Sequence, residues 1–285
     1  MISIKNEEGI RFLESVEDAS IDLILTDPPY ITSKDTGMNR WVEHVKKQDS
    51  VDSVDIKTEE GWNVWVEKNQ DKLEGRKSKE VVAMKQNFIK YGSVYGKKYA
   101  RVTDFGDWDK QFTLEKMNQF VSQFNRVLRP GGTAIIFFDL WKISDLKKIL
   151  EDNKFKQLRF IEWIKTNPQP LNSKRNYLTN SREIALTAVK GGRPTFNSQY
   201  DSGTYRFPMQ GGKNRTHPTQ KSLLLFEKLI EVHSNPGDVI LDPFLGAGTT
   251  AVAAQNLNRN FIGCDVDKEF CKNAAGWIKK TKETF

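Results

Sequence analysis

The sequence predicts an α/β fold built on a doubly wound, mainly parallel sheet. Strand and helix patterns alternate along most of the chain, which is typical of βαβ units. The stretch 133–138 is almost continuously apolar, as expected for a central strand covered on both faces. Two expected strands run directly into turns that begin with Asp27 and Asp242. Because such folds bind ligands at the carboxyl ends of their strands, both turns are candidate site segments.

The expected elements follow from hydrophobic periodicity and from Gly and Pro breaks. A strand at 2–4 and a helical pattern at 10–16 precede the strand 21–26. After an interruption, the expected elements are a helix at 114–128, a strand at 133–138, a helix at 143–150, strands at 160–165 and 184–189, a helix at 223–232, a strand at 239–241, a helix at 249–257, a strand at 261–264 and a final helix.

The alternation disappears between residues 31 and 103, which we interpret as an insertion. A loop of that length without structure is unusual in a compact domain, so we expect a DNA-binding or active-site module, partly disordered. Trp62 and Trp65 lie three residues apart and are expected to pack within a local helix. The remaining segments, 1–30 and 104–285, form the expected catalytic domain.

Composition narrows the class of protein. The 285 residues include 44 Lys and Arg against 37 Asp and Glu, and the net charge of +7 weakly favours a polyanionic partner. Cys264 and Cys271 have no neighbouring histidine, so we expect free thiols and no metal site. We see neither a signal peptide nor an apolar run long enough for a membrane span, and expect a cytoplasmic protein without membrane contact.

The turn Asp242-Pro243-Phe244-Leu245-Gly246-Ala247-Gly248 joins an expected strand to a helix. Glycines there let a ligand approach bare backbone at a helix N-terminus. The turn lacks the third glycine of a dinucleotide fingerprint and the lysine of a P-loop. Asp265 ends the next strand about 20 residues on, where an acid binds ribose hydroxyls. A nucleoside-like ligand fits best; an ordinary tight turn is the alternative.

The turn Asp27-Pro28-Pro29-Tyr30 carries groups suited to activating an exocyclic amine. Such a nitrogen is a poor nucleophile because its lone pair is conjugated with the base. A carboxylate and a rigid carbonyl that each accept an amine hydrogen direct the lone pair toward a methyl donor. Asp27 and the Pro28 carbonyl supply this pair, and Tyr30 is placed to stack on the base. A plain Pro-Pro turn is the alternative.

With both turns in place, the chain resembles the β group of DNA adenine-N6 methyltransferases, as found in type II restriction–modification systems. The similarity runs from the start to Tyr30 and from about Asp104 to the end. Other matching segments are Leu128-Arg129-Pro130-Gly131-Gly132, Trp163-Ile164-Lys165-Thr166-Asn167-Pro168 and His217-Pro218-Thr219-Gln220-Lys221. The resemblance implies a circularly permuted, seven-stranded Rossmann-like sheet with an inserted target-recognition region.

The resemblance also implies S-adenosylmethionine as cofactor and assigns residues to it. Asp27, Pro28, Pro29 and Tyr30 would be catalytic. The implied cofactor-binding residues are Asn6, near the adenine; Thr219 and Lys221, near the methionine part; Asp265, on the ribose; and Asp27, Asp242, Phe244, Gly246, Gly248 and Thr249. Four positions depart from the family pattern: Asn6 stands where aspartate is common, Ser222 where proline is usual, Asp265 where glutamate is commoner and Phe270 where tyrosine is frequent.

The expected substrate is DNA, with double strands requiring base flipping and single strands left open. Candidate phosphate contacts are Lys97, Lys98, Lys165, Lys174, Arg175 and Arg182, and segment 167–215 is a candidate for target recognition. An Asp at position 27 resembles adenine enzymes, whereas cytosine enzymes typically have serine. Methylation of cytosine or of RNA adenine remains an alternative, as does a catalytically silent DNA-binding subunit. The resemblance implies a bacterial, archaeal or phage enzyme. A restriction endonuclease that acts separately and a second copy of the chain in a homodimer are its candidate partners.

Overall fold

The computed structural model describes residues 1–29, 58–91, 94, 112–168, 180–211 and 220–282. The chain divides into two compact units, one formed by 1–31 with 107–285 and the other by 32–106. These bounds lie beside those of the expected insertion, whose role in DNA binding stays a prediction. Within the described residues, no helix is both long and apolar enough to cross a membrane.

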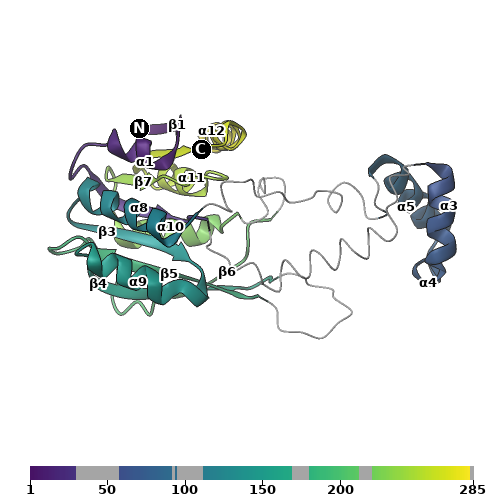
Figure 1. The fold of residues 1–285 in the computed structure, drawn as a ribbon, viewed down its shortest axis with the longest axis horizontal. Coiled ribbons are helices and arrows are strands. Elements are labelled where there is room, and N and C mark those ends of the chain that lie inside the picture. The colour runs from purple at the N-terminus through teal and green to yellow at the C-terminus, as the bar shows by residue number, and fades with distance from the viewer. Residues whose placement is uncertain (30–57, 92–93, 95–111, 169–179, 212–219, 283–285) are drawn as a thin grey trace. The chain divides into compact units, whose positions relative to one another are not determined.

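The larger unit contains an eight-stranded sheet in the order β1-β8-β7-β2-β3-β5-β4-β6 (Figure 1). Neighbours pair in parallel from β1 to β3, β5 runs antiparallel to both β3 and β4, and β6 is parallel to β4. The strands are β1 (Ile2–Asn6), β2 (Ile21–Thr26), β3 (Leu128–Phe138), β4 (Lys156–Lys165), β5 (Arg182–Val189), β6 (Thr204–Phe207), β7 (Val239–Asp242) and β8 (Asn260–Asp265).

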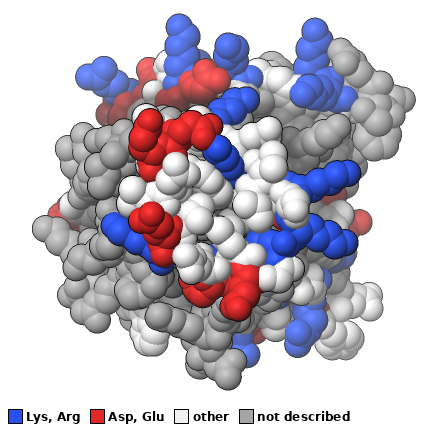
Figure 2. Space-filling model, turned by 90° about the vertical axis from the view of Figure 1, so that its right-hand side faces the viewer, with Lys and Arg blue, Asp and Glu red and all other residues white. Residues whose placement is uncertain are grey.

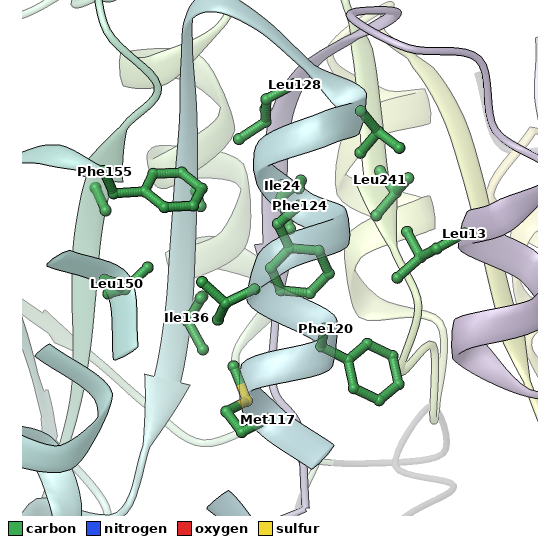
Figure 3. Packing of buried hydrophobic residues seen from close by; sticks show 14 of the residues in the cluster. Leu13, Ile24, Met117, Phe120, Phe124, Leu128, Ile136, Leu150, Phe155 and Leu241 are labelled. Carbon is green, nitrogen blue, oxygen red and sulfur yellow. The ribbon is translucent and has the colours of Figure 1, made fainter. Parts of the chain in front are cut away.

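One face of this sheet is covered by α1 (Gly9–Glu14), α8 (Leu114–Val127) and α9 (Ile143–Asp152). The apolar side of α8 carries Met117, Phe120 and Phe124, all essentially inaccessible to solvent. They pack toward Ile24 and Ile136 of the central strands (Figure 3). Thr113 caps α8 by accepting a hydrogen bond from the Lys116 amide, which fixes where the helix begins.

The opposite face is covered by α10 (Leu223–His233), α11 (Thr249–Asn256) and α12 (Lys268–Lys282). Leu23 and Leu25 of β2 point into this second core, while Ile24 between them points into the first. This alternation follows from the two-residue period of a strand, and it explains why β2 is apolar throughout. Helices on both faces confirm the predicted doubly wound α/β fold.

Two features of the sheet differ from the sequence-based expectation. The sheet has eight strands rather than seven, because β6 forms within the segment assigned to target recognition and pairs with β4. The strand β3 begins at Leu128 and includes the Pro-Gly-Gly turn that was expected to precede it. The pairing of β2 with β3 is irregular between Ile21 and Leu23, and Gly131 has a positive φ of +80°. The Pro-Gly-Gly segment therefore forms an irregularity within β3 and does not separate the helix from the strand.

The described part of the smaller unit consists of α3 (Glu59–Lys68), α4 (Gln70–Leu73) and α5 (Ser78–Tyr91). Trp62 and Trp65 stack with ring centroids 5.3 Å apart, and both are buried with Met84 and Phe88. The expectation that these tryptophans pack within local helices is therefore confirmed. The unit has a small hydrophobic core of its own.

Candidate active site

The two predicted turns meet where the strand order reverses. Strands β2 and β7 are adjacent, and the chain continues from β2 toward β3 on one side and from β7 toward β8 on the other. Such a switch point leaves a crevice at the carboxyl ends of the strands. Asp27 directly follows β2 and Asp242 ends β7, so both acidic residues lie at this position.

Asp242 joins the two turns through its buried carboxylate. It accepts hydrogen bonds from the Thr26 hydroxyl at 2.7 Å and from the Thr250 hydroxyl at 2.6 Å. The backbone amide of Phe244 donates to the same carboxylate at 3.0 Å. Burial raises the pKa of Asp242 to about 6, although these hydrogen bonds favour its ionised form. Asp242 thus fixes the cofactor turn to β2 and to the first turn of α11.

The two glycines of the cofactor turn have different surroundings. An added Cβ on Gly246 would meet nothing nearer than the Phe244 carbonyl oxygen at 3.9 Å, so this backbone borders open space. An added Cβ on Gly248 would lie 2.6 Å from the Cβ of Ala274 in α12. The backbone at Gly246 is therefore not closely covered, whereas Gly248 permits close packing of α11 on α12. Binding of a nucleoside-like ligand at Gly246 stays a prediction. Thr249, also expected at the cofactor, is buried at the start of α11.

Asp265 lies beside this turn at the end of β8. Its carboxylate accepts hydrogen bonds from the backbone amides of Gly246 at 2.8 Å and Asp267 at 2.9 Å. Burial raises the pKa of Asp265 above its usual range. A carboxylate has lone pairs for further hydrogen bonds, so these contacts orient Asp265 and still leave room for ribose hydroxyls. Its binding to ribose stays a prediction.

Asn6 and Phe244 make protein contacts that the sequence did not indicate. The Asn6 side-chain amide donates to the carbonyl oxygens of Asp265 and Val266, both at 2.9 Å, and so ties β1 to the end of β8. The Phe244 ring is half-buried, with its centroid 4.5 Å from that of Phe120 and 5.6 Å from that of Phe112. Both residues border the cofactor turn, and their contacts with the cofactor remain predictions.

Lys221 lies beside Asp27, the predicted catalytic aspartate. Its ammonium is 2.9 Å from Asp27 Oδ2 and 2.5 Å from Glu183 Oε2, and its side chain is only 6% exposed. The resemblance had placed Lys221 near the methionine part of the cofactor, whereas the structure places its charge between two carboxylates. Glu183 also pairs with Lys165, whose ammonium is 2.6 Å from Glu183 Oε1.

The residues expected to contact DNA fall into three groups. Lys165 differs from the expected phosphate contact, because its side chain is only 9% exposed and its charge faces Glu183. Arg182 is 67% exposed and lies 3.5 Å from Glu162, which leaves it accessible to a phosphate. Lys97, Lys98, Lys174 and Arg175 lie outside the described residues, as do the catalytic Tyr30 and the cofactor candidate Thr219. In Figure 2, the described Lys and Arg side chains are interspersed with acidic ones.

Glu183, Thr26 and Thr250 contribute to the site but were not predicted from the sequence. Glu183 stands at the start of a buried strand, next to Arg182, in a stretch otherwise marked by basic residues. This acidic residue within a basic stretch is the sequence feature that could have indicated a role for Glu183 in the site. The two threonines carried no signal, because only the folded chain brings their hydroxyls to Asp242.

The fold and the site define an α/β enzyme with a nucleoside-binding turn beside an Asp-Pro-Pro turn. Residues 21–276 match the N6/N4 methyltransferase family, described as DNA methylase. The chain belongs to this family, which confirms the sequence-based prediction of a DNA methyltransferase. Since the family name covers both N6 and N4 amines, the match by itself does not choose between adenine and cytosine.

Relatives and solved structures agree with this assignment. The type II methyltransferase M2.DpnII of Streptococcus pneumoniae is 37% identical over 203 residues, which cover 64% of this chain and 74% of that protein. The crystal structure of a complex of M1.HpyAVI with S-adenosylmethionine is 26% identical, with a TM-score of 0.58, and covers 97% of this chain and all of that one. The cytosine-N4-specific PvuII methyltransferase has a TM-score of 0.63 at 14% identity, over 99% of this chain and 90% of that one, and supports the fold alone.

Proposed function

We propose that the protein transfers a methyl group from S-adenosylmethionine to the exocyclic amine of adenine in DNA. The observation that carries the proposal is the adjacency of Asp27 and the Gly246 turn at the switch point of one sheet. The hydrogen bond between Thr26 and Asp242 fixes these two segments to each other. Acceptor and donor would meet there in a defined orientation.

The residues fit the cofactor. Gly246 offers backbone that borders open space, and the Asp265 carboxylate lies 2.8 Å from its amide nitrogen, at the expected ribose position. S-adenosylmethionine would supply an electrophilic methyl group at this turn. The 8-residue helix α11 begins directly after Gly248, so its first backbone amides also face this end of the sheet.

The acceptor amine is activated by the Asp-Pro-Pro turn. The Asp27 carboxylate and the Pro28 carbonyl each accept one amine hydrogen, which directs the nitrogen lone pair toward the donor. Proline suits this position because its carbonyl is held rigidly and it has no competing N–H. As the bond to the methyl group forms, positive charge develops on the nitrogen, and the negative charge of Asp27 stabilises it.

Adenine is favoured over cytosine by Asp27, since an aspartate at this position resembles adenine enzymes. In duplex DNA the amine is buried in the base stack, so the target nucleotide must be flipped out at a cost of a few kcal/mol. Arg182 is accessible for a backbone phosphate. A restriction endonuclease partner, a homodimer, the choice between single and double strands and a cytoplasmic location stay predictions.

Incubation with labelled S-adenosylmethionine and, in separate reactions, plasmid DNA, single-stranded DNA and RNA, followed by nucleoside analysis, tests the proposal. We expect N6-methyladenine from duplex or single-stranded DNA. N4-methylcytosine, or methyladenine only in RNA, would support the alternative substrates, and no product at all would favour the silent DNA-binding subunit.

Asp27→Asn should abolish transfer and leave cofactor binding intact, because the cofactor turn is held by Asp242 rather than by Asp27. Asp18→Asn is the matched control. Asp18 precedes the same strand at its other end, and its side chain is 74% exposed. Retained transfer by Asp27→Asn at the rate of the Asp18 variant would contradict the assigned role.

A further inference from the structure

Four charged groups of alternating sign form a cluster that extends from the end of β2 to the end of β4. This charge cluster consists of Asp27, Lys221, Glu183 and Lys165, whose side chains are between 6% and 24% exposed. Glu183 pairs in register with Trp163 in β4, two residues before Lys165. Because β5 runs antiparallel to its neighbours, its first residues lie at the same edge as the carboxyl ends of β2, β3 and β4.

The intervening strand β3 contributes an aromatic ring instead of a charge. The Lys221 ammonium lies 5.5 Å from the centroid of the Phe137 ring, and the Lys165 ammonium lies 5.4 Å from that of Trp163. Both lysines are therefore held in largely apolar surroundings. An ammonium in such a place is costly unless a carboxylate compensates it.

Glu183 compensates both lysines at once. It lies nearer to the Lys221 ammonium, at 2.5 Å, than Asp27 does, at 2.9 Å. Burial alone would raise the pKa of Glu183, but the charges of Lys221 and Lys165 hold it at about 2, so the residue is ionised at any assay pH. Without this charge, the Lys221 and Lys165 ammonium groups would each lose a carboxylate that lies within 2.6 Å.

We propose that Glu183 is a positioning residue for methyl transfer, which fixes the Lys221 ammonium against Asp27 and offsets its positive charge. The inference rests on the proposed function. Methyl transfer places positive charge on the acceptor nitrogen, and the positive charge of Lys221 beside Asp27 would oppose it more strongly if Glu183 did not offset that charge. Glu183 touches neither substrate nor cofactor in this scheme, and it acts through Lys221.

The test compares Glu183→Gln with wild type in steady-state and single-turnover methylation of plasmid DNA. We expect kcat to fall about 100-fold, the size of effect that misplacement of a reacting group produces. The KM values for DNA and S-adenosylmethionine, and the calorimetric Kd for the cofactor, should not change. Glu162→Gln is the matched control, since Glu162 lies on β4 and pairs with the exposed Arg182. An active Glu183→Gln with wild-type kcat overturns the inference.

A second variant covers the case in which Glu183→Gln fails to fold. Lys165→Met/Glu183→Gln removes the lysine that would lose its partner and leaves Lys221 with Asp27. The double variant should fold and show the same loss in kcat; a rate like that of Lys165→Met alone overturns the inference. Wild-type protein without any transfer activity overturns the proposed function itself, and this inference with it.

Discussion

Replacing Gly248 with alanine should destabilise the protein mainly through the packing of α11 on α12. Gly248 has φ +86°, in the left-handed region, which costs a residue with a Cβ about 1–2 kcal/mol. The new Cβ would also lie 2.6 Å from the Cβ and 3.1 Å from the Cα of Ala274, which must shift. Overpacking of this kind costs about 1–3 kcal/mol. The expected total is therefore about 2–5 kcal/mol.

Urea or guanidinium unfolding of four variants measures the two parts of this cost: Gly248→Ala, Gly237→Ala, Ala274→Gly and the double variant Gly248→Ala/Ala274→Gly. Gly237→Ala is the control, because Gly237 has φ +90° but an added Cβ would meet nothing within 4 Å. Its loss should be about 1–2 kcal/mol. In a double-mutant cycle, Ala274→Gly should recover part of the Gly248→Ala loss. If Gly248→Ala and Gly237→Ala lose the same stability, the contact with Ala274 adds no cost, which contradicts the prediction.

Gly246→Ala should affect cofactor binding more than stability, in contrast to Gly248→Ala. An added Cβ at Gly246 would occupy open space instead of striking a neighbouring helix, so little stability is lost beyond the backbone strain at φ +49°. It would, however, stand where the cofactor is expected to approach. Calorimetry should therefore find a larger increase in the Kd for S-adenosylmethionine with Gly246→Ala than with Gly237→Ala. Equal affinities would place the cofactor away from Gly246.

Two further variants test Asp242 and Arg182. Burial raises the pKa of Asp242 from 3.8 to about 6, so the folded state binds this proton more tightly than the unfolded state does. The free energy of unfolding should therefore fall as the pH rises from about 4 to above 6. Relative to Asp242→Asn, wild type should lose about 2 kcal/mol between pH 4 and 7; parallel curves would contradict the burial argument. Arg182→Ala should weaken DNA binding and reduce the slope of log K against log salt by about 0.9. Arg159→Ala is its control, because Arg159 lies on β4 opposite Thr187, further along β5 from Arg182. An equal slope in both variants would exclude Arg182 as a phosphate contact.

The parts of the fold that could be predicted from the sequence are those in which several consecutive residues indicate the same element. Strand β2 and the Gly246 turn could be predicted because an apolar strand, a Pro or Gly break and a carboxylate follow one another directly along the chain. Strand β6 was missed because it is an edge strand of four residues with only half-buried or exposed side chains, so it has little hydrophobic pattern. Its formation depends on pairing with β4, which the local sequence does not encode.

The charged groups were the least predictable part of the site. Lys165 and Lys221 have long flexible side chains, and the same residue type serves as a phosphate contact or as half of a buried ion pair. The choice depends on whether a carboxylate lies within reach, and Glu183 reaches both lysines only after β4 and β5 have paired. Charge along the chain therefore indicated a basic edge, whereas the folded structure neutralises part of it internally.

The catalytic turn is held from two directions by consecutive residues. Thr26 donates to Asp242, which fixes the last residue of β2 to the cofactor strand β7. Asp27 pairs with Lys221, which is held in turn by Glu183 at the start of β5. The position of the acceptor carboxylate relative to the cofactor turn is thus set by neighbouring strands of one sheet. Since orientation of the reacting groups contributes much of the barrier reduction in methyl transfer without covalent catalysis, this double attachment allows the amine and the methyl donor to be aligned before the reaction begins.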